Sequence, residues 1–373
     1  MKNIRTHIVF ICMLAFACRE PYNPPPVQTV TNYLVVEGLV NANDSSHIIL
    51  SRTRPLTDAN GVSPETHAVV TLEGEAGSNF NFVETGNGNY VLPNMNLLLN
   101  QKYRLKIVTN SNVVYQSDFA QVKETPPIDT ITWSREGDIV TIEANTHDPD
   151  NDTRYYRWEF EETWEYHAFF ESFLLFENQQ VIFRDSTQYT YKCYQSDRSH
   201  RIILGTSANL TQDVIEHLPL IAIPRASQKI DVMYSILVKQ YALTREGFDF
   251  WQLLQKNGEQ GGSIFSIQPS QLLGNIRCVS KPDEPVIGYI SVSTVTTKRV
   301  FIKNSDLGNW PPILAYDHCK EKFLVDSFAY YLNADTTLGP AYFVTGGALA
   351  IAKKDCIDCK RFGGTLTKPS FWK

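Results

Sequence analysis

The sequence lacks the motifs that would assign it directly to a class of enzyme. It has no G-x-S-x-G nucleophile elbow, no G-x-x-x-x-G-K-[ST] phosphate loop, no H-E-x-x-H zinc motif and no G-x-G-x-x-G dinucleotide motif. It also lacks an excess of positive charge, because the formal net charge is −6, and this argues against a nucleic-acid surface. We therefore expect a non-enzymatic protein with no cofactor and no nucleic-acid partner.

Long apolar runs are absent after the N-terminus. Beyond residue 18 no segment reaches about 18 consecutive apolar residues, so no later segment is expected to span a membrane as a helix. No internal repeat recurs at a fixed period. Hydrophobic residues make up 43% of the chain and aromatic residues 12%, which is enough for packed cores. The length indicates two or three folded domains.

Residues 1–17 have the pattern of a lipoprotein signal peptide. Lys2 and Arg5 give a positive start, and the uncharged run Ile8–Ala17 suits a signal-peptide core but is too short to span a bilayer. Cys18 follows a small residue, and Leu14–Cys18 resembles a bacterial lipobox. We expect cleavage before Cys18 and acylation of this residue, with ordinary secretion as the alternative.

Residues 18–30 are expected to be a tether. The segment is rich in proline, which excludes a helix or a central strand. An extended polyproline II chain rises by about 3.1 Å per residue and would hold the folded body away from the membrane. Several acyl chains on Cys18 would anchor it stably.

The rest of the chain predicts a mainly β protein. Residues 31–125 contain about seven short alternating segments, with a hairpin signal at Asn87-Gly88, and this pattern predicts an immunoglobulin-like β-sandwich. The prolines that follow Thr125 mark a boundary. Residues 126–305 predict a second β-sandwich-like domain with one inserted helix, and residues 306–373 a cysteine-containing C-terminal region.

The second domain carries the clearest secondary-structure signals. Aromatic residues alternate from Tyr156 to Phe160, and Ile230–Val238 places apolar residues on one face. The helix is expected at residues 245–256, with Thr244 as its N-cap. Its apolar stripe comprises Phe250, Leu253 and Leu254.

Five cysteines follow the anchor. They are Cys193, Cys278, Cys319, Cys356 and Cys359. Because exported thiols tend to oxidise, we expect up to two disulfides with one cysteine left over. One pairing among several is Cys278 with Cys319 and Cys356 with Cys359. A zinc site formed by His318 with Cys319, Cys356 and Cys359 is one alternative, and a redox role for the C-x-x-C pair is another.

An acidic cluster has the spacing of a calcium loop. Asp148, Asp150 and Asp152 stand at alternate positions, and Glu159 falls at the twelfth position of the loop. Thr153 occupies the position where the loop needs glycine, and the flanking segments read as strands. An Asp-rich turn is therefore the main expectation, and calcium is the weaker one.

A run of glutamates lies among aromatic residues. Glu159, Glu161, Glu162 and Glu165 alternate with tryptophan and tyrosine side chains, a combination that also occurs in sugar-binding clefts. We expect the aromatic residues to be core and the glutamates to face solvent. A hydrolase or glycan-processing enzyme that uses two of these carboxylates is the alternative.

Several segments in order resemble one family. They are Tyr33–Leu39, Thr146–Pro149, Tyr155–Trp158, Tyr234–Tyr241, Gly274–Cys278, Gly288–Ser293, Cys356–Cys359 and Lys368–Trp372. Together they resemble the "domain of unknown function 4249" lipoproteins of the Bacteroidota over nearly the whole mature chain. The resemblance implies an outer-membrane lipoprotein, facing the surface or the periplasm, with an immunoglobulin-like or carboxypeptidase-regulatory-like N-terminal sandwich. It also implies an accessory or ligand-binding role beside a TonB-dependent receptor, with a structural or adhesive role as the alternative. It transfers no catalytic residue.

Overall fold

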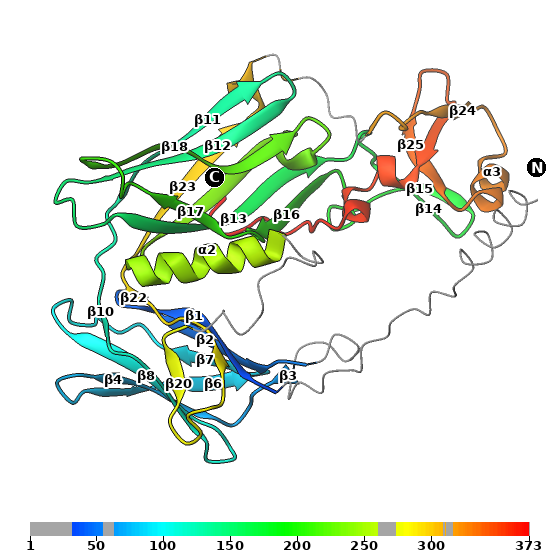
Figure 1. The fold of residues 1–373 in the computed structure, drawn as a ribbon. Helices are drawn as coiled ribbons and strands as arrows, with labels where there is room; N and C mark the ends of the chain where they lie inside the picture. The colour runs from blue at the N-terminus through cyan, green and yellow to red at the C-terminus, as the bar shows by residue number, and fades with distance from the viewer. Residues whose placement is uncertain (1–31, 55–62, 260–273, 309, 311–315, 373) are drawn as a thin grey trace, which may run out of the picture.

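The structure is a computed structural model. It describes residues 32–54, 63–259, 274–308, 310 and 316–372, so the predicted signal peptide, the tether and Cys18 lie outside the described residues. Figure 1 shows three groups of strands, which run from blue and cyan through green to orange and red along the chain. The described chain is mainly β, as the sequence predicts.

The first group is a sandwich of two sheets around one core. Alternation builds it: in β8 (Lys102–Val108), Tyr103, Leu105 and Ile107 are buried while the intervening side chains face outward. One sheet contains β1 (Leu34–Asn41), β2 (Ser46–Arg52), β3 (Ser63–Pro64), β6 (Val83–Gly86) and β7 (Asn89–Leu92). The other contains β4 (Val69–Gly74), β5 (Asn79–Asn81), β8, β9 (Val114–Ser117) and β10 (Ala120–Gln121). The predicted β-sandwich is confirmed.

The predicted hairpin at Asn87-Gly88 joins β6 to β7. Both residues have positive φ, 51° at Asn87 and 74° at Gly88, as a two-residue turn between twisted strands requires. Asn tolerates this conformation and Gly adopts it freely. The prediction of this turn is confirmed.

Three short strands from much later in the chain complete the first sandwich. They are β20 (Ile276–Cys278), β21 (Val286–Ile287) and β22 (Val292–Ser293), which pair with β9 and β1. The predicted range 126–305 placed these residues in the second domain, and for residues 276–293 this assignment is wrong. Short strands that pair across more than 150 residues leave no local pattern that assigns them to a sheet.

The second group packs a three-stranded sheet against a five-stranded one. The first contains β11 (Ile128–Glu136), β12 (Ile139–Asp148) and β18 (Asp213–Pro224). The second contains β13 (Tyr155–His167), β16 (Lys192–Arg198), β17 (Ile203–Thr206), β19 (Met233–Ala242) and β23 (Val295–Lys303). Tyr156, Trp158 and Phe160 lie in the core between them, as predicted from their spacing.

The predicted helix is α2 (Arg245–Glu259), which starts where expected and ends three residues later. The Thr244 hydroxyl accepts a hydrogen bond from the Gly247 N–H at 3.1 Å, so its predicted capping role is confirmed.

The guanidinium of Arg157 on β13 lies near the rings of Trp251 on α2 and Tyr241 on β19, 4.3 and 4.6 Å from their centroids. This cation–π contact helps to hold the helix against the sheet.

The third group is the C-terminal unit. It contains β24 (Lys322–Leu324), β25 (Leu338–Phe343) and β26 (Leu349–Lys353), with α3 (Phe328–Ala334) beside them. The hairpin β14 (Leu174–Glu177) and β15 (Gln180–Phe183) packs into the same cluster, although the sequence placed it in the second domain. Short 3₁₀ helices η1 (Gln228–Ile230), η3 (Asn304–Leu307), η5 (Lys354–Cys356) and η6 (Cys359–Phe362) complete the elements.

Among the described residues, no helix has the length and apolar character needed to cross a membrane.

We predict that Gly288→Ala unfolds the first sandwich more easily. Gly288 has φ +147°, and a Cβ there would lie 2.3 Å from the Val36 carbonyl oxygen of β1, so β21 would have to move away. The free energy of unfolding should fall by about 3 kcal/mol. Gly137→Ala is the control, because Gly137 also has positive φ but faces open space, and it should cost about 1 kcal/mol. Urea denaturation measures both, and equal costs would contradict the prediction.

Candidate functional site

Two disulfides connect distant parts of the chain. Cys193 is bonded to Cys359 and Cys319 to Cys356, at sequence separations of 166 and 37 residues. Cys278 is a free thiol buried in the first sandwich. The expectation of two disulfides and one remaining cysteine is confirmed. The suggested pairing of Cys278 with Cys319 and of Cys356 with Cys359 is wrong, because Cys278 lies on β20 in another core.

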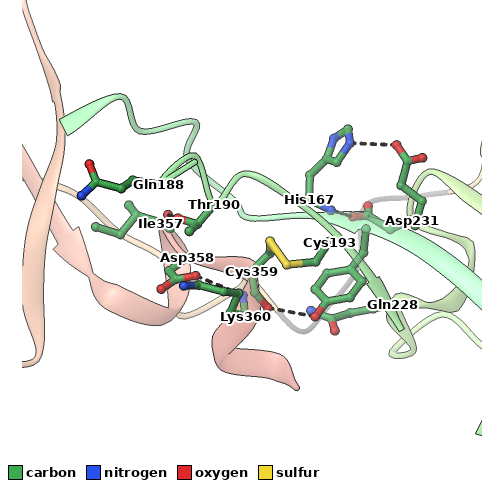
Figure 2. The surroundings of a disulfide bond; sticks show 12 residues. His167, Gln188, Thr190, Cys193, Gln228, Asp231, Ile357, Asp358, Cys359 and Lys360 are labelled. Atoms are coloured by element: carbon green, nitrogen blue, oxygen red, sulfur yellow. Dashed lines mark hydrogen bonds and ion pairs between the residues drawn. A yellow bond between two sulfur atoms is a disulfide. The ribbon is translucent and has the colours of Figure 1, made fainter. Parts of the chain in front are cut away.

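The first disulfide fixes the C-terminal segment to the five-stranded sheet (Figure 2). Cys193 stands on β16, opposite Tyr166 of β13. The Tyr166 hydroxyl donates to the Cys359 carbonyl at 2.8 Å, and the Cys359 N–H donates to the Thr190 carbonyl at 3.0 Å. Both sulfur-bearing residues are fully buried. These contacts make the disulfide part of the second core.

The second disulfide lies beside a histidine. The Nε2 atom of His318 is 3.8 Å from the sulfur of Cys319 and 3.8 Å from that of Cys356. The Asp355 carboxylate is 3.1 Å from the same nitrogen. The predicted zinc site included Cys359 as well, but Cys359 is bonded to Cys193 and is no part of this group. The C-x-x-C pair likewise forms no disulfide within itself.

Two glutamates of the aromatic run are buried, contrary to the expectation that they face solvent. Glu162 is 2% exposed, and it accepts hydrogen bonds from Lys229 Nζ at 2.5 Å and from the Tyr234 hydroxyl at 2.8 Å. Residues two positions apart in a strand lie on the same face of the sheet, so Glu162 lies on the same face as Phe160, whose side chain is in the core. Burial and the nearby Glu162 carboxylate raise the pKa of Tyr234 well above its ordinary value.

Glu165 is the second buried carboxylate. Burial raises its pKa, but the Lys192 ammonium at 2.8 Å and the Trp372 indole N–H at 3.1 Å outweigh this, so the pKa of Glu165 is lowered. Glu165 is therefore ionised at neutral pH. A general acid needs the opposite shift, a raised pKa.

The other two glutamates also have cationic partners. Glu159 pairs with Arg157 at 2.7 Å, and Glu161 pairs with Lys239 at 2.5 Å. A groove of about 430 Å³ beside Glu161 and Glu162 is lined also by Arg299 and Asp197. Glu161 and Glu162 both line this groove, but each is held in an ion pair, with Lys239 and Lys229 respectively, so neither is a free carboxylate of the kind that glycoside hydrolysis uses.

The predicted calcium residues do not form a cluster. The Asp148 carboxylate accepts hydrogen bonds from the backbone N–H groups of Asp150, Asp152 and Thr153 at 2.8–3.1 Å. These bonds outweigh the effect of burial and lower the pKa of Asp148. Glu159 is engaged with Arg157 instead. Among the described residues, Asp148, Asp150, Asp152 and Glu159 form no group of metal ligands, and the hydrogen bonds of Asp148 are those of the Asp-rich turn that was the main expectation.

A second groove, of about 480 Å³, lies on the three-stranded sheet and was not predicted. His147 Nδ1 lies 2.7 Å from Asp129 Oδ2, and His217 Nδ1 lies 2.8 Å from Glu143 Oε2. The hydrogen bond that the His147 ring donates to the Asp129 carboxylate raises the pKa of His147. The β12–β18 pairing is irregular on both sides of Ala144. Bulges of this kind depend on how two strands pair, so the alternation of residues along β12 alone could not predict them or the groove beside them.

The C-terminal unit exposes several large aromatic residues. We define the C-terminal aromatic surface as Phe183 on β15, Tyr330 and Tyr331 on α3, and Phe343 on β25. Phe183 is 76% exposed and Tyr330 is 70% exposed. α3 packs against β15 and reaches β25 through the rings of Phe328 and Phe343, 6.2 Å apart. Adjoining exposed aromatic residues of this kind often mark interaction sites.

We predict that Glu162→Gln destabilises the fold. Removing the charge leaves Lys229 unpaired beside the core, and the free energy of unfolding should fall by about 2–3 kcal/mol. Glu161→Gln is the matched control on the same strand. Glu161 is 53% exposed in its ion pair, so its change should cost less than about 1 kcal/mol. If thermal and urea unfolding gave equal losses, the buried pair would not have the role assigned to it.

Comparisons with known proteins identify the family but no activity. No curated protein matches the chain significantly. A two-domain fibronectin type III segment of chicken tenascin aligns with 10% identity and a TM-score of 0.18, covering 57% of this chain and 92% of that one. The Yersinia pseudotuberculosis adhesin InvE aligns with 12% identity and a TM-score of 0.16, covering 56% and 54%. Residues 19–299 match the family described as "Domain of unknown function (DUF4249)", and the chain therefore belongs to this family.

Proposed function

We propose that the chain is a non-enzymatic lipoprotein of the bacterial cell envelope, anchored in the outer membrane through Cys18. Its role is to bind a TonB-dependent outer-membrane receptor or to capture a ligand for it. The two disulfides carry the proposal. Disulfides persist in oxidising compartments and are rare in the cytosol, and four of the five cysteines after Cys18 are paired here.

The C-terminal aromatic surface supports a binding role. Its side chains belong to three adjoining elements, and Phe183 and Tyr330 are exposed over more than two thirds of their area. Aromatic residues are enriched in protein interfaces, where they contribute much of the binding energy. The disulfide between Cys319 and Cys356 closes the loop that holds α3 and β25, so the surface stands on a constrained scaffold.

The geometry gives less support to the hydrolase alternative. Each glutamate of the run has a cationic partner, and Glu162 and Glu165 are enclosed in the fold. Structural ion pairs of this kind stabilise a fold without offering a free acid and base.

Replacing Cys18 tests the anchor. We predict that Cys18→Ala abolishes incorporation of labelled fatty acid and moves the protein from the membrane fraction to the soluble one, because a folded body without acyl chains has no anchor of this type. Cys278→Ala is the control, since that buried thiol should have no effect on fractionation. Unchanged labelling of Cys18→Ala would contradict the proposal.

Isolation from native membranes tests the partner. A tagged chain, cross-linked and purified from its own outer membrane, should recover one TonB-dependent receptor reproducibly. The double change Phe183→Ala and Tyr330→Ala should reduce this recovery at least about tenfold, a loss expected of two interface anchors. Val83→Ala is the control, because Val83 is 60% exposed on the first sandwich. Recovery of the chain alone, or equal recovery by all variants, would contradict the proposal.

A further inference from the structure

The second disulfide has the surroundings of a metal site. Cys319 follows the turn that starts at Tyr316, and Cys356 ends η5. The His318 ring lies close to both cysteines and to Asp355. The Nε2 atom of His318 and the sulfurs of Cys319 and Cys356 all lie within 4.8 Å of one another. His318 is exposed, so the group is accessible from solvent.

The distance of the His318 nitrogen from each of the two sulfurs matches the spacing of zinc ligands. Zinc binds sulfur at about 2.3 Å and imidazole nitrogen at about 2.0 Å in a tetrahedron, which puts neighbouring ligand atoms roughly 3.5 Å apart. The distance from His318 Nε2 to each sulfur is 3.8 Å. Asp355 adds a carboxylate oxygen 3.1 Å from the same nitrogen. The sulfurs of Cys319 and Cys356 and the His318 nitrogen form a group of three mutually close ligand atoms, and the neighbouring Asp355 carboxylate would have to shift to become a fourth ligand.

We propose that the Cys319–Cys356 pair, when reduced, forms a zinc site with His318 and Asp355. A dithiol reductant supplies two electrons and two protons, the S–S bond breaks, and the reductant becomes a disulfide. Zinc then displaces the two protons from the thiols, and the metal is bound by two thiolates, the neutral His318 ring and the Asp355 carboxylate. When the zinc-free thiols pass two electrons and two protons to a disulfide oxidant, that oxidant is reduced to a dithiol and the Cys319–Cys356 bond forms again.

The other disulfide lacks these ligands. Cys193 and Cys359 are 0% exposed and packed in the second core. Within the described part of the chain, no histidine, aspartate or glutamate joins their sulfurs in a comparable group. The two disulfides therefore provide an internal comparison, because only one of them should exchange its covalent bond for a metal.

The zinc site would close the same loop as the disulfide. The segment between Cys319 and Cys356 holds β24, α3, β25 and β26. A metal bound at both ends restricts the unfolded chain as a covalent link does, so the C-terminal unit would remain folded in both redox states. The C-terminal aromatic surface would then be preserved when the thiols are reduced.

Cobalt substitution tests the site on the full mature chain. The protein is reduced without oxygen by a phosphine, which does not compete as a thiol ligand, and titrated with Co²⁺ and then with Zn²⁺. We expect one Co²⁺ per chain, a thiolate-to-cobalt charge-transfer band and the intense visible bands of a tetrahedral site, all removed by Zn²⁺. The oxidised protein should show none of these bands.

Variants and alkylation locate the site. His318→Ala should weaken Zn²⁺ binding at least about tenfold, as expected for loss of a ligand. His200→Ala should leave it unchanged, because His200 is an exposed histidine paired with Asp197 and does not belong to the group of ligand atoms around Cys319 and Cys356. In the reduced wild-type chain, Zn²⁺ should protect Cys319 and Cys356 from alkylation but not Cys193 and Cys359, as read by peptide mass spectrometry. The alkylation experiment uses the wild-type chain, so its result does not depend on whether a variant folds.

Three results would overturn the proposal. They are absence of a thiolate–cobalt band in the reduced chain, equal Zn²⁺ affinity of His318→Ala and wild type, and protection of Cys193 and Cys359 in place of the other pair.

Discussion

Cys359 lies against β16 because its sulfur is bonded to that of Cys193, 166 residues earlier in the chain. The segment that follows depends on this bond. Thr365 bridges to Tyr194 on the same strand, and Trp372 packs against Tyr194 and donates to the buried Glu165. In the chain-entropy account, closing a loop of this length restricts the unfolded state by about 5 kcal/mol. The disulfide thus makes the C-terminus part of the second core.

The chain crosses between its structural units more than once. After α2 it returns to the first sandwich as β20, β21 and β22, then re-enters the second group as β23. The Thr125 hydroxyl and N–H both bond to Thr294, which joins the two crossing segments. Consecutive stretches of sequence are therefore not consecutive units in space. The Cys193–Cys359 disulfide and these crossings link parts of the described chain that are far apart in sequence.

Local signals in the sequence predicted the local structure well. Alternation identified the strands, Asn87-Gly88 the hairpin, and Thr244 the start of α2, because each depends on neighbouring residues only. Partners far apart in sequence were not predictable. The cysteine pairing, the return of residues 276–293 to the first sandwich and the burial of Glu162 against Lys229 all depend on tertiary contacts. The two buried glutamates, Glu162 and Glu165, could not be distinguished from the other two glutamates of the run by their sequence context.

The proposed function requires that the protein folds in an oxidising compartment with two specific disulfides. The most direct test is a disulfide map of the protein isolated from its own membranes, alkylated at once and digested without reduction. Mass spectrometry should find linked peptides for Cys193 with Cys359 and for Cys319 with Cys356, and an alkylated Cys278. Full alkylation of all five cysteines, or a link between Cys356 and Cys359, would contradict the account.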